Sequence, residues 1–129
     1  MLRLVAGVFL ALHGLVHLMG FVVAWKLGTI EGLPYTTTLL NGSWDVGPTG
    51  LQVLGLVWLV AALGFVAVGF GIIVRQAWWS SAIFVVAFLS LVITALQWPE
   101  AQFGLYIDLA VIAALLIGRR GATRSRLAN

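Results

Sequence analysis

Both histidines of the chain lie in one short segment, "ALHGLVH", residues 11–17, inside a long apolar run. Residues four apart on an α-helix share a face and lie about 6 Å apart along the axis, so His13 and His17 should point the same way. Two adjacent imidazoles can bind a metal ion, move a proton or hydrogen-bond a neighbouring helix. The pair therefore marks a candidate site inside the protein.

One acidic residue, Asp108, interrupts the last apolar run of the chain. A charged carboxylate at the centre of a membrane span costs about 2.5–3.5 kcal/mol on insertion scales, so Asp108 needs a partner. If the first run leaves the membrane near Trp25, His17 lies about two turns below the outer surface, and Asp108 lies one to two turns below it. We therefore expect His17 and Asp108 to share a depth and to meet.

Other polar and aromatic residues fall near the same surface and extend the expected pocket. Its polar wall should comprise His13, His17, Gln52, Gln97 and Asp108, and its rim should comprise Trp44, Asp45, Trp98 and Glu100.

The surroundings of this pocket follow from composition. Apolar residues make up 62% of the 129 residues and charged residues only 9%, whereas soluble domains carry about a quarter charged residues. Mean hydropathy is +1.11. We expect a single integral membrane domain, all-α, built as an antiparallel four-helix bundle. The expected spans are 4–25, 51–74, 77–98 and 102–118, with an external loop over 26–50. The first run is too long for a cleavable signal peptide.

Charge placement predicts the orientation of these spans. Six arginines fall at the N-terminus, between spans two and three, or after span four: Arg3, Arg75, Arg119, Arg120, Arg124 and Arg126. With an even number of crossings these positions share one side, which should be cytoplasmic, so both termini should face the cytoplasm. The basic segment 118–129 is expected to touch anionic lipid rather than nucleic acid.

Small residues recur in every span at the spacing of close helix packing. The first two spans carry Gly7, Ala11, Gly14, Gly55, Ala62 and Gly69. Such faces let helix backbones approach within lipid, where apolar burial gives no net drive. They are expected to pack the four helices together, and they could also recruit partner subunits or a second copy of the chain.

Several functions remain open for the polar pocket. His13, His17 and Asp108 match a site with two histidines and one carboxylate for a metal ion. The same groups suit proton transfer or acid–base chemistry on a lipid-like ligand. They could instead only tie helices together by hydrogen bonds. Haem is not expected, because two histidines on one helix face cannot be both axial ligands, and ligation would need a second copy or Met19.

Some membrane chemistries are excluded by composition. The chain has no cysteine, so it cannot perform thiol–disulfide exchange. Lys26, its only lysine, lies at the end of a span, which excludes a retinal Schiff base inside the helices. No glycine-rich phosphate loop is present, and the length leaves no room for a nucleotide-binding domain.

The segments "HGLVHLMGF", residues 13–21, and "QWPEAQFG", residues 97–104, resemble a family of small bacterial four-span inner-membrane proteins with an HGxxHxxGF signature. This resemblance implies a multi-pass protein of the bacterial cytoplasmic membrane. A fainter architectural likeness to DoxX-like membrane proteins implies an accessory subunit of a redox complex. We expect an accessory or ligand-binding membrane protein; the alternatives are a metal-dependent redox protein or lipid-acting enzyme, and a purely structural interaction subunit.

Overall fold

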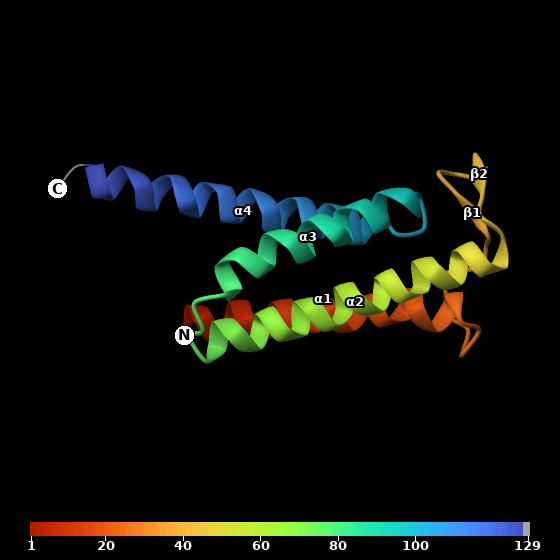
Figure 1. Ribbon diagram of the computed structural model, residues 1–129, viewed down its shortest axis with the longest axis horizontal. Helices are drawn as coiled ribbons and strands as arrows, with labels where there is room; N and C mark the ends of the chain where they lie inside the picture. The colour runs from red at the N-terminus through yellow and green to blue at the C-terminus, as the bar shows by residue number, and fades with distance from the viewer. Residues whose placement is uncertain (128–129) are drawn as a thin grey trace.

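The computed structural model describes the backbone of residues 1–127 and the side chains of residues 1–117. In this part, the elements in order are α1 (Leu2–Ala24), β1 (Thr38–Leu39), β2 (Trp44–Asp45), α2 (Gly47–Ile73), α3 (Trp79–Leu96) and α4 (Gln102–Leu127). The helices run side by side in alternating directions, and both chain ends lie at the same end of the molecule (Figure 1). The predicted all-α class with four helices is confirmed.

Helix boundaries differ from the expected spans mainly where polar sequence continues a helix. The α2 helix begins at Gly47, with Pro48 in its first turn, because proline fits a helix start without loss of a hydrogen bond. The α4 helix continues to Leu127, beyond the apolar run. The segment 118–129, expected to touch anionic lipid, lies outside the residues whose side chains the structure describes.

Three of the helices, α1, α2 and α3, are long and apolar enough to cross a membrane. The described side chains of α4 add a shorter apolar stretch, Gln102–Ile117. Large apolar side chains point outward from these helices, as Leu63, Phe88 and Phe103 do with 60–75% of their surface exposed. An outer surface of this kind is suited to lipid rather than to water.

The tightest packing joins α1 to α2 along their whole length. A Cβ atom added to Gly14 would lie 2.7 Å from the carbonyl oxygen of Ala62 and 2.8 Å from the Cβ of Phe65. A Cβ added to Gly69 would lie 2.5 Å from the carbonyl oxygen of Gly7. The two backbones therefore approach each other through small residues, as the sequence pattern predicted.

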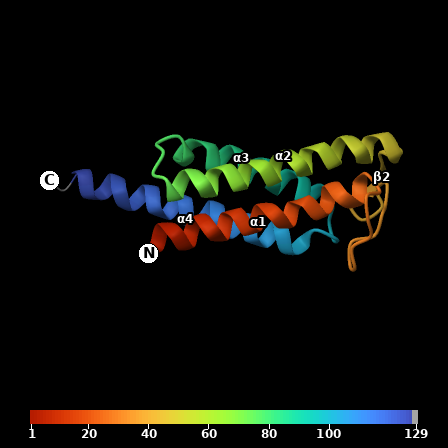
Figure 2. The same ribbon diagram turned by 90° about the horizontal axis from the view of Figure 1, so that it is seen from below.

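The α2 helix packs next on α3, and α3 on α4, but α1 and α4 scarcely contact each other. In Figure 1 the pair α3 and α4 lies apart from the pair α1 and α2, and Figure 2 shows α1 and α4 along the same side of the molecule. A core of Leu10, Phe65, Val68, Ile83 and Ala87 lies between α1, α2 and α3, and apolar residues of α4 pack against it. The arrangement leaves a seam between the first helix and the last.

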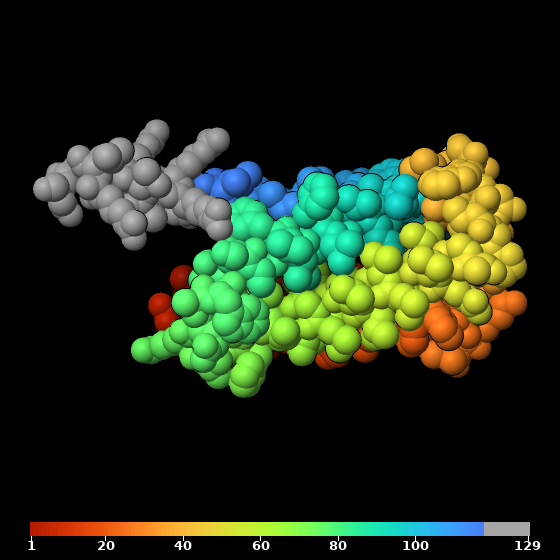
Figure 3. All heavy atoms as spheres, in the orientation of Figure 1, coloured from red at the N-terminus to blue at the C-terminus, as the bar shows by residue number. Residues whose placement is uncertain are grey.

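The connection between α1 and α2 folds over the end of the helices opposite the termini, where its orange and yellow atoms form a cap (Figure 3). Its short hairpin pairs Leu39 with Trp44, and Leu39 is buried. The backbone N–H groups of Leu40 and Asn41 donate to the carbonyl oxygens of Leu96 and Trp98, each at 2.9 Å. The loop is thereby attached to the end of α3.

Close packing at Gly14 leads to a first prediction. Gly14→Ala should lower the free energy of unfolding by about 1–3 kcal/mol, because the added methyl group forces α1 away from α2. Thermal unfolding in detergent measures the effect. Gly28→Ala is the control, since its added Cβ has only one neighbour, at 3.4 Å. Equal stability of the Gly14 variant and wild type would contradict this packing.

Candidate functional site

The two histidines and Asp108 meet in the middle of the molecule. His13 and His17 are almost fully buried, and Asp108 has no exposed surface. The Nε2 atom of His13 lies 3.0 Å from Oδ1 of Asp108. This contact joins α1 to α4 across the seam, which the two helices otherwise leave without direct packing.

A serine on α3 completes the connection between the two histidines. The Nδ1–H of His17 donates to the carbonyl oxygen of His13 at 2.9 Å, which turns Nε2 toward α3. That Nε2 lies 2.5 Å from Oγ of Ser90, and Ser90 donates to Oδ2 of Asp108, also at 2.5 Å. Thr94, one turn further along α3, places its hydroxyl 3.5 Å from the same carboxylate oxygen. We call His13, His17, Ser90 and Asp108 the polar centre.

The direct partner of Asp108 is His13, whereas the sequence led us to expect His17. The two imidazoles leave the same face of α1, but this face lies against the gap between α3 and α4. His17 reaches α3 and His13 reaches α4. Depth along the helix was therefore a weaker guide than the direction in which each ring points.

The hydrogen bonds of the polar centre limit the number of protons that it can hold. It contains four contacts: His17 Nδ1 to His13 O, His17 Nε2 to Ser90 Oγ, Ser90 Oγ to Asp108 Oδ2, and Asp108 Oδ1 to His13 Nε2. Each contact needs one hydrogen atom. Two neutral imidazoles and one hydroxyl supply three, and an ionised carboxylate supplies none.

All four contacts are therefore satisfied only when the centre holds one further proton. The same proton makes the centre electrically neutral as a whole, which favours burial in an apolar interior. It can reside on His17, with Asp108 ionised, or on Asp108, with His17 neutral. The two forms interconvert by shifting protons through the hydroxyl of Ser90, so the geometry is that of a short proton relay.

Aromatic side chains of α2 form the wall behind the imidazoles. The ring of Phe65 lies 4.8 Å from that of His13 and 5.3 Å from that of His17, measured between centroids. The ring of Trp58 lies 5.1 Å from that of His17. Its Nε1–H donates to Oε1 of Gln97 at 2.6 Å, which connects the wall to the end of α3. These contacts restrict the rotation of both imidazoles.

A cavity of about 540 Å³ opens beside the polar centre, between α1, the start of α4 and the loop at residues 30–33. We call it the histidine cavity. Nδ1 of His13 has no hydrogen-bond partner. Among the described residues, every fully buried side-chain nitrogen or oxygen has one. That ring nitrogen therefore keeps some accessible surface, and His13 is one of the residues that line the cavity. The remaining polar lining comes from Glu31, Glu100 and Gln102.

A second cavity, of about 660 Å³, continues along the seam toward the termini. We call it the apolar cavity, because its walls are side chains such as Phe9, Leu10 and Ala114, with Arg3 as its charged member. Ile107 lines both cavities. The seam is thus one groove with a polar end and an apolar end, crossed by the contact between His13 and Asp108.

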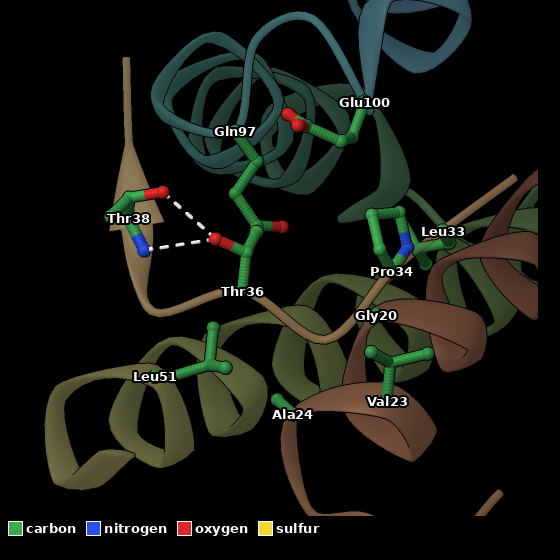
Figure 4. A pocket seen from close by; sticks show the side chains of 10 residues that line it. All are labelled: Gly20, Val23, Ala24, Leu33, Pro34, Thr36, Thr38, Leu51, Gln97 and Glu100. Carbon is green, nitrogen blue, oxygen red and sulfur yellow. Dashed lines mark hydrogen bonds between the residues drawn. The ribbon is translucent and has the colours of Figure 1, made fainter. Parts of the chain in front are cut away.

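A third space lies under the loop and is much smaller, at about 20 Å³, which is room for about one water molecule (Figure 4). Gln97 and Glu100 extend toward it from the end of α3 and the turn that follows (Figure 4). Thr36 and Thr38 of the loop are hydrogen-bonded to each other at its edge. Its size excludes a ligand larger than water.

Not all of the expected pocket residues join the histidines. Gln52 is exposed, because it lies on the outer side of α2, and its backbone carbonyl accepts the indole N–H of Trp25. Trp44 and Asp45 belong to the exposed hairpin and do not line the histidine cavity. Trp98 is partly exposed and contacts the ring of Tyr106. The loop segment that covers the cavity is instead residues 30–33.

Sequence reasoning missed Ser90 and the position of Thr94 beside Asp108. A signal was present: residues 87, 90, 94 and 97 of α3 share one helix face, and three of them are polar. A polar stripe on an otherwise apolar span predicts contact with other polar groups. Trp58 was missed because nothing in its spacing separates it from a membrane-interface tryptophan.

The polar centre also contains a potential metal-ligand set. His13, His17 and Asp108 each offer one ligand atom, and these atoms lie within 4.8 Å of one another. All three side chains are buried, which distinguishes the set from a surface cluster of acidic groups.

The relay geometry predicts a stability effect for Ser90→Ala. The substitution leaves Nε2 of His17 and Oδ2 of Asp108 without their shared partner, so the free energy of unfolding should fall by about 1–3 kcal/mol. Thermal unfolding in detergent measures it. Ser43→Ala, in the exposed hairpin turn, should change stability by less than about 0.5 kcal/mol. Equal effects of the two substitutions would mean that Ser90 does not connect buried groups.

A second prediction concerns Asp45, whose carboxylate accepts hydrogen bonds from the backbone N–H of Gly47, at 2.9 Å, and from the side chain of Thr37. These bonds hold the pKa of Asp45 below its usual value. The stabilisation is therefore present above the unfolded-state pKa and is lost as the pH falls through the folded-state pKa. Unfolding midpoints should fall less steeply for Asp45→Asn than for wild type below about pH 4. Parallel curves would show that these bonds do not stabilise the loop.

Comparison with known proteins leaves the site without a precedent. No protein-family model, curated protein or solved structure gives a significant match to the chain. The function must therefore be argued from the polar centre and the cavities beside it.

Proposed function

We propose that the protein is a multi-pass membrane protein that binds a long-chain amphiphile in the groove between α1 and α4. The head group of this ligand would lie in the histidine cavity and its chain would follow the apolar part of the seam. The observation that carries the proposal is a cavity of about 540 Å³ that is lined by His13, whose Nδ1 has no hydrogen-bond partner. Cavities of about 300–1,000 Å³ with a few polar groups are typical of ligand sites.

Four membrane crossings are supported by the three long apolar helices, the apolar stretch of α4 and the exposed apolar side chains. Both chain ends lie at one end of the molecule, as an even number of crossings requires. The arginine distribution favours a cytoplasmic position for that end and an outer position for the loop. We propose the bacterial cytoplasmic membrane as the location, on the resemblance of residues 13–21 and 97–104 to small inner-membrane proteins.

The chemistry of the groove indicates the class of ligand. Glu31 and Glu100 line the histidine cavity, so a neutral or cationic head group fits better than an anionic one. Nδ1 of His13 can accept one hydrogen bond from it, because the ring proton is on Nε2. Val16, Met19 and Ile107 form apolar walls beside the head group, and Ile107 continues into the apolar cavity. A polar head group with one or two hydrocarbon chains matches a polar cavity that is followed by an apolar one.

The interpretation that the histidines only tie helices together explains most of the polar centre but not its accessible edge. A purely structural cluster has no need of an adjoining cavity of ligand size or of a ring nitrogen without a partner. An accessory role beside other membrane subunits, or in a homo-oligomer, is compatible with ligand binding. The bilayer is the surrounding medium in either case.

The proposal is tested by filling the groove. Val16→Trp should reduce the amphiphile that copurifies with the protein at least fivefold, because the indole would occupy the histidine cavity that Val16 lines. Mass spectrometry of lipid extracts, normalised to protein, measures the retained species. Val60→Trp is the matched control: Val16 and Val60 are 54% and 57% exposed, and Val60 does not line a cavity of the groove.

A second variant separates binding from folding. His13→Gln keeps a hydrogen-bonding side chain opposite Asp108 but removes the imidazole edge, so it should retain the thermal stability of wild type more closely than His13→Leu while losing the ligand. Retention of one amphiphile at wild-type level in both Val16→Trp and His13→Gln would refute the proposal. The absence of any enriched amphiphile in wild type would favour a purely structural subunit.

A further inference from the structure

We infer that His13, His17 and Asp108 form a binding site for a divalent first-row transition metal ion at the base of the histidine cavity. The three side chains come from α1 and α4 and place their ligand atoms within 4.8 Å of one another. Two imidazole nitrogens and one carboxylate oxygen are a donor set that suits ions such as Zn²⁺ or Fe²⁺. The inference builds on the proposed function, because the same site would hold both ion and head group.

The distances fit an ion after small side-chain movements. Metal–ligand bonds of about 2.1 Å place neighbouring ligand atoms about 3.0–3.4 Å apart in octahedral or tetrahedral geometry. Nε2 of His13 and Oδ1 of Asp108 are already 3.0 Å apart. Only Nε2 of His17 must move inward, from Oγ of Ser90 toward the other two atoms. This movement requires a small rotation of the His17 side chain along the aromatic wall and the loss of its contact with Ser90, without a movement of the helices.

The orientation of His17 supports this assignment independently of distance. Metal-binding histidines almost always donate their second ring N–H to a carbonyl or carboxylate, which fixes the tautomer and leaves the other nitrogen free to coordinate. His17 makes this contact, because its Nδ1–H donates to the carbonyl oxygen of His13 at 2.9 Å. Its Nε2 is thereby aimed at the polar centre and offers a lone pair once the extra proton of the centre has left.

The charge of the site also fits a cation. In the metal-bound form the extra proton of the polar centre leaves and the ring proton of His13 moves from Nε2 to Nδ1, since Nε2 of each histidine and both oxygens of Asp108 must be unprotonated. A divalent ion with one carboxylate leaves one net positive charge. Glu31 and Glu100 line the adjoining histidine cavity, so their carboxylates would lie on the side where this positive charge is exposed. Three protein ligands leave at least one position open toward the cavity for water or a polar head group.

The test uses the untagged, detergent-purified full-length protein and Co²⁺ as the probe. Titration with Co²⁺ should produce visible d–d absorption that saturates at one ion per chain. Three substitutions should each weaken the affinity for Co²⁺ at least tenfold, because each removes one of the three ligands: His13→Gln, His17→Gln and Asp108→Asn. Competition with Zn²⁺ should abolish the absorption at equal stoichiometry.

Ser90→Ala separates a ligand set from a hydrogen-bond network. Ser90 contacts both His17 and Asp108 but is not one of the three ligands, and it competes with the ion for Nε2 of His17. Binding in this variant should equal or exceed that of wild type. Asp45→Asn should leave the visible spectrum unchanged, since its carboxylate belongs to the exposed hairpin and does not line the histidine cavity. Loss of binding in Ser90→Ala, or no saturable absorption in wild type, would overturn the inference.

Failure of the metal site and failure of the proposed function give different results. Val16→Trp fills the cavity beside the polar centre without removing a ligand, so it should bind Co²⁺ while losing the amphiphile. A wild-type protein that retains an amphiphile but shows no cobalt spectrum would refute the metal site alone. A protein that binds Co²⁺ but enriches no amphiphile would refute the proposed function alone.

Discussion

A carboxyl group with no exposed surface sets the conditions for the middle of this molecule. Asp108 lies among apolar helices, where an unpartnered charge is not tolerated, so its two oxygens must find hydrogen-bond partners within reach. One oxygen meets His13 and the other meets Ser90. These partners come from α1 and α3, and the aromatic wall behind them comes from α2. The burial of one side chain on α4 thereby fixes how all four helices meet.

The same requirement explains why two kinds of helix contact coexist. Glycine-rich packing holds the backbones of α1 and α2 in close contact. The histidine face of α1 consequently reaches α3 and α4, with Phe65 and Trp58 of α2 beside the imidazoles. There the contacts are made by long polar side chains, and the space that backbones do not fill remains as two cavities. Close packing on one side of α1 thus positions the polar side that borders the cavities.

The sequence was informative where a single physical rule dominates. Uncharged runs longer than a bilayer predicted the helices, and the cost of a buried charge predicted that Asp108 would meet a histidine. It was less informative where side-chain direction decides the outcome. Choosing between His13 and His17 requires the rotation of α1, which its packing against α2 sets. Gln52 shows the same limit, because a polar residue at the right depth can still face outward.

The loop between α1 and α2 was predicted to cover the pocket, but spacing could not show which part does so. Its hairpin is bonded to the end of α3, which carries Trp44 and Asp45 away from the histidines. The turn at residues 30–33 takes their place. Its isolated bridge pairs Ile30 with Leu33 across Gly32, which has a positive φ of 78°. Only the folded loop reveals this exchange of roles.

The seam between α1 and α4 has a consequence for how any occupant would arrive. Its walls include exposed apolar side chains, among them Val16 and Phe103, so the entrance faces the side of the molecule rather than its end. For a membrane-embedded protein, such an entrance samples solutes already dissolved in hydrocarbon and not the aqueous phase. Occupancy would then follow the mole fraction of a molecule among the surrounding lipids. A modest affinity would then suffice for occupancy, because the bilayer already holds the ligand at high local concentration.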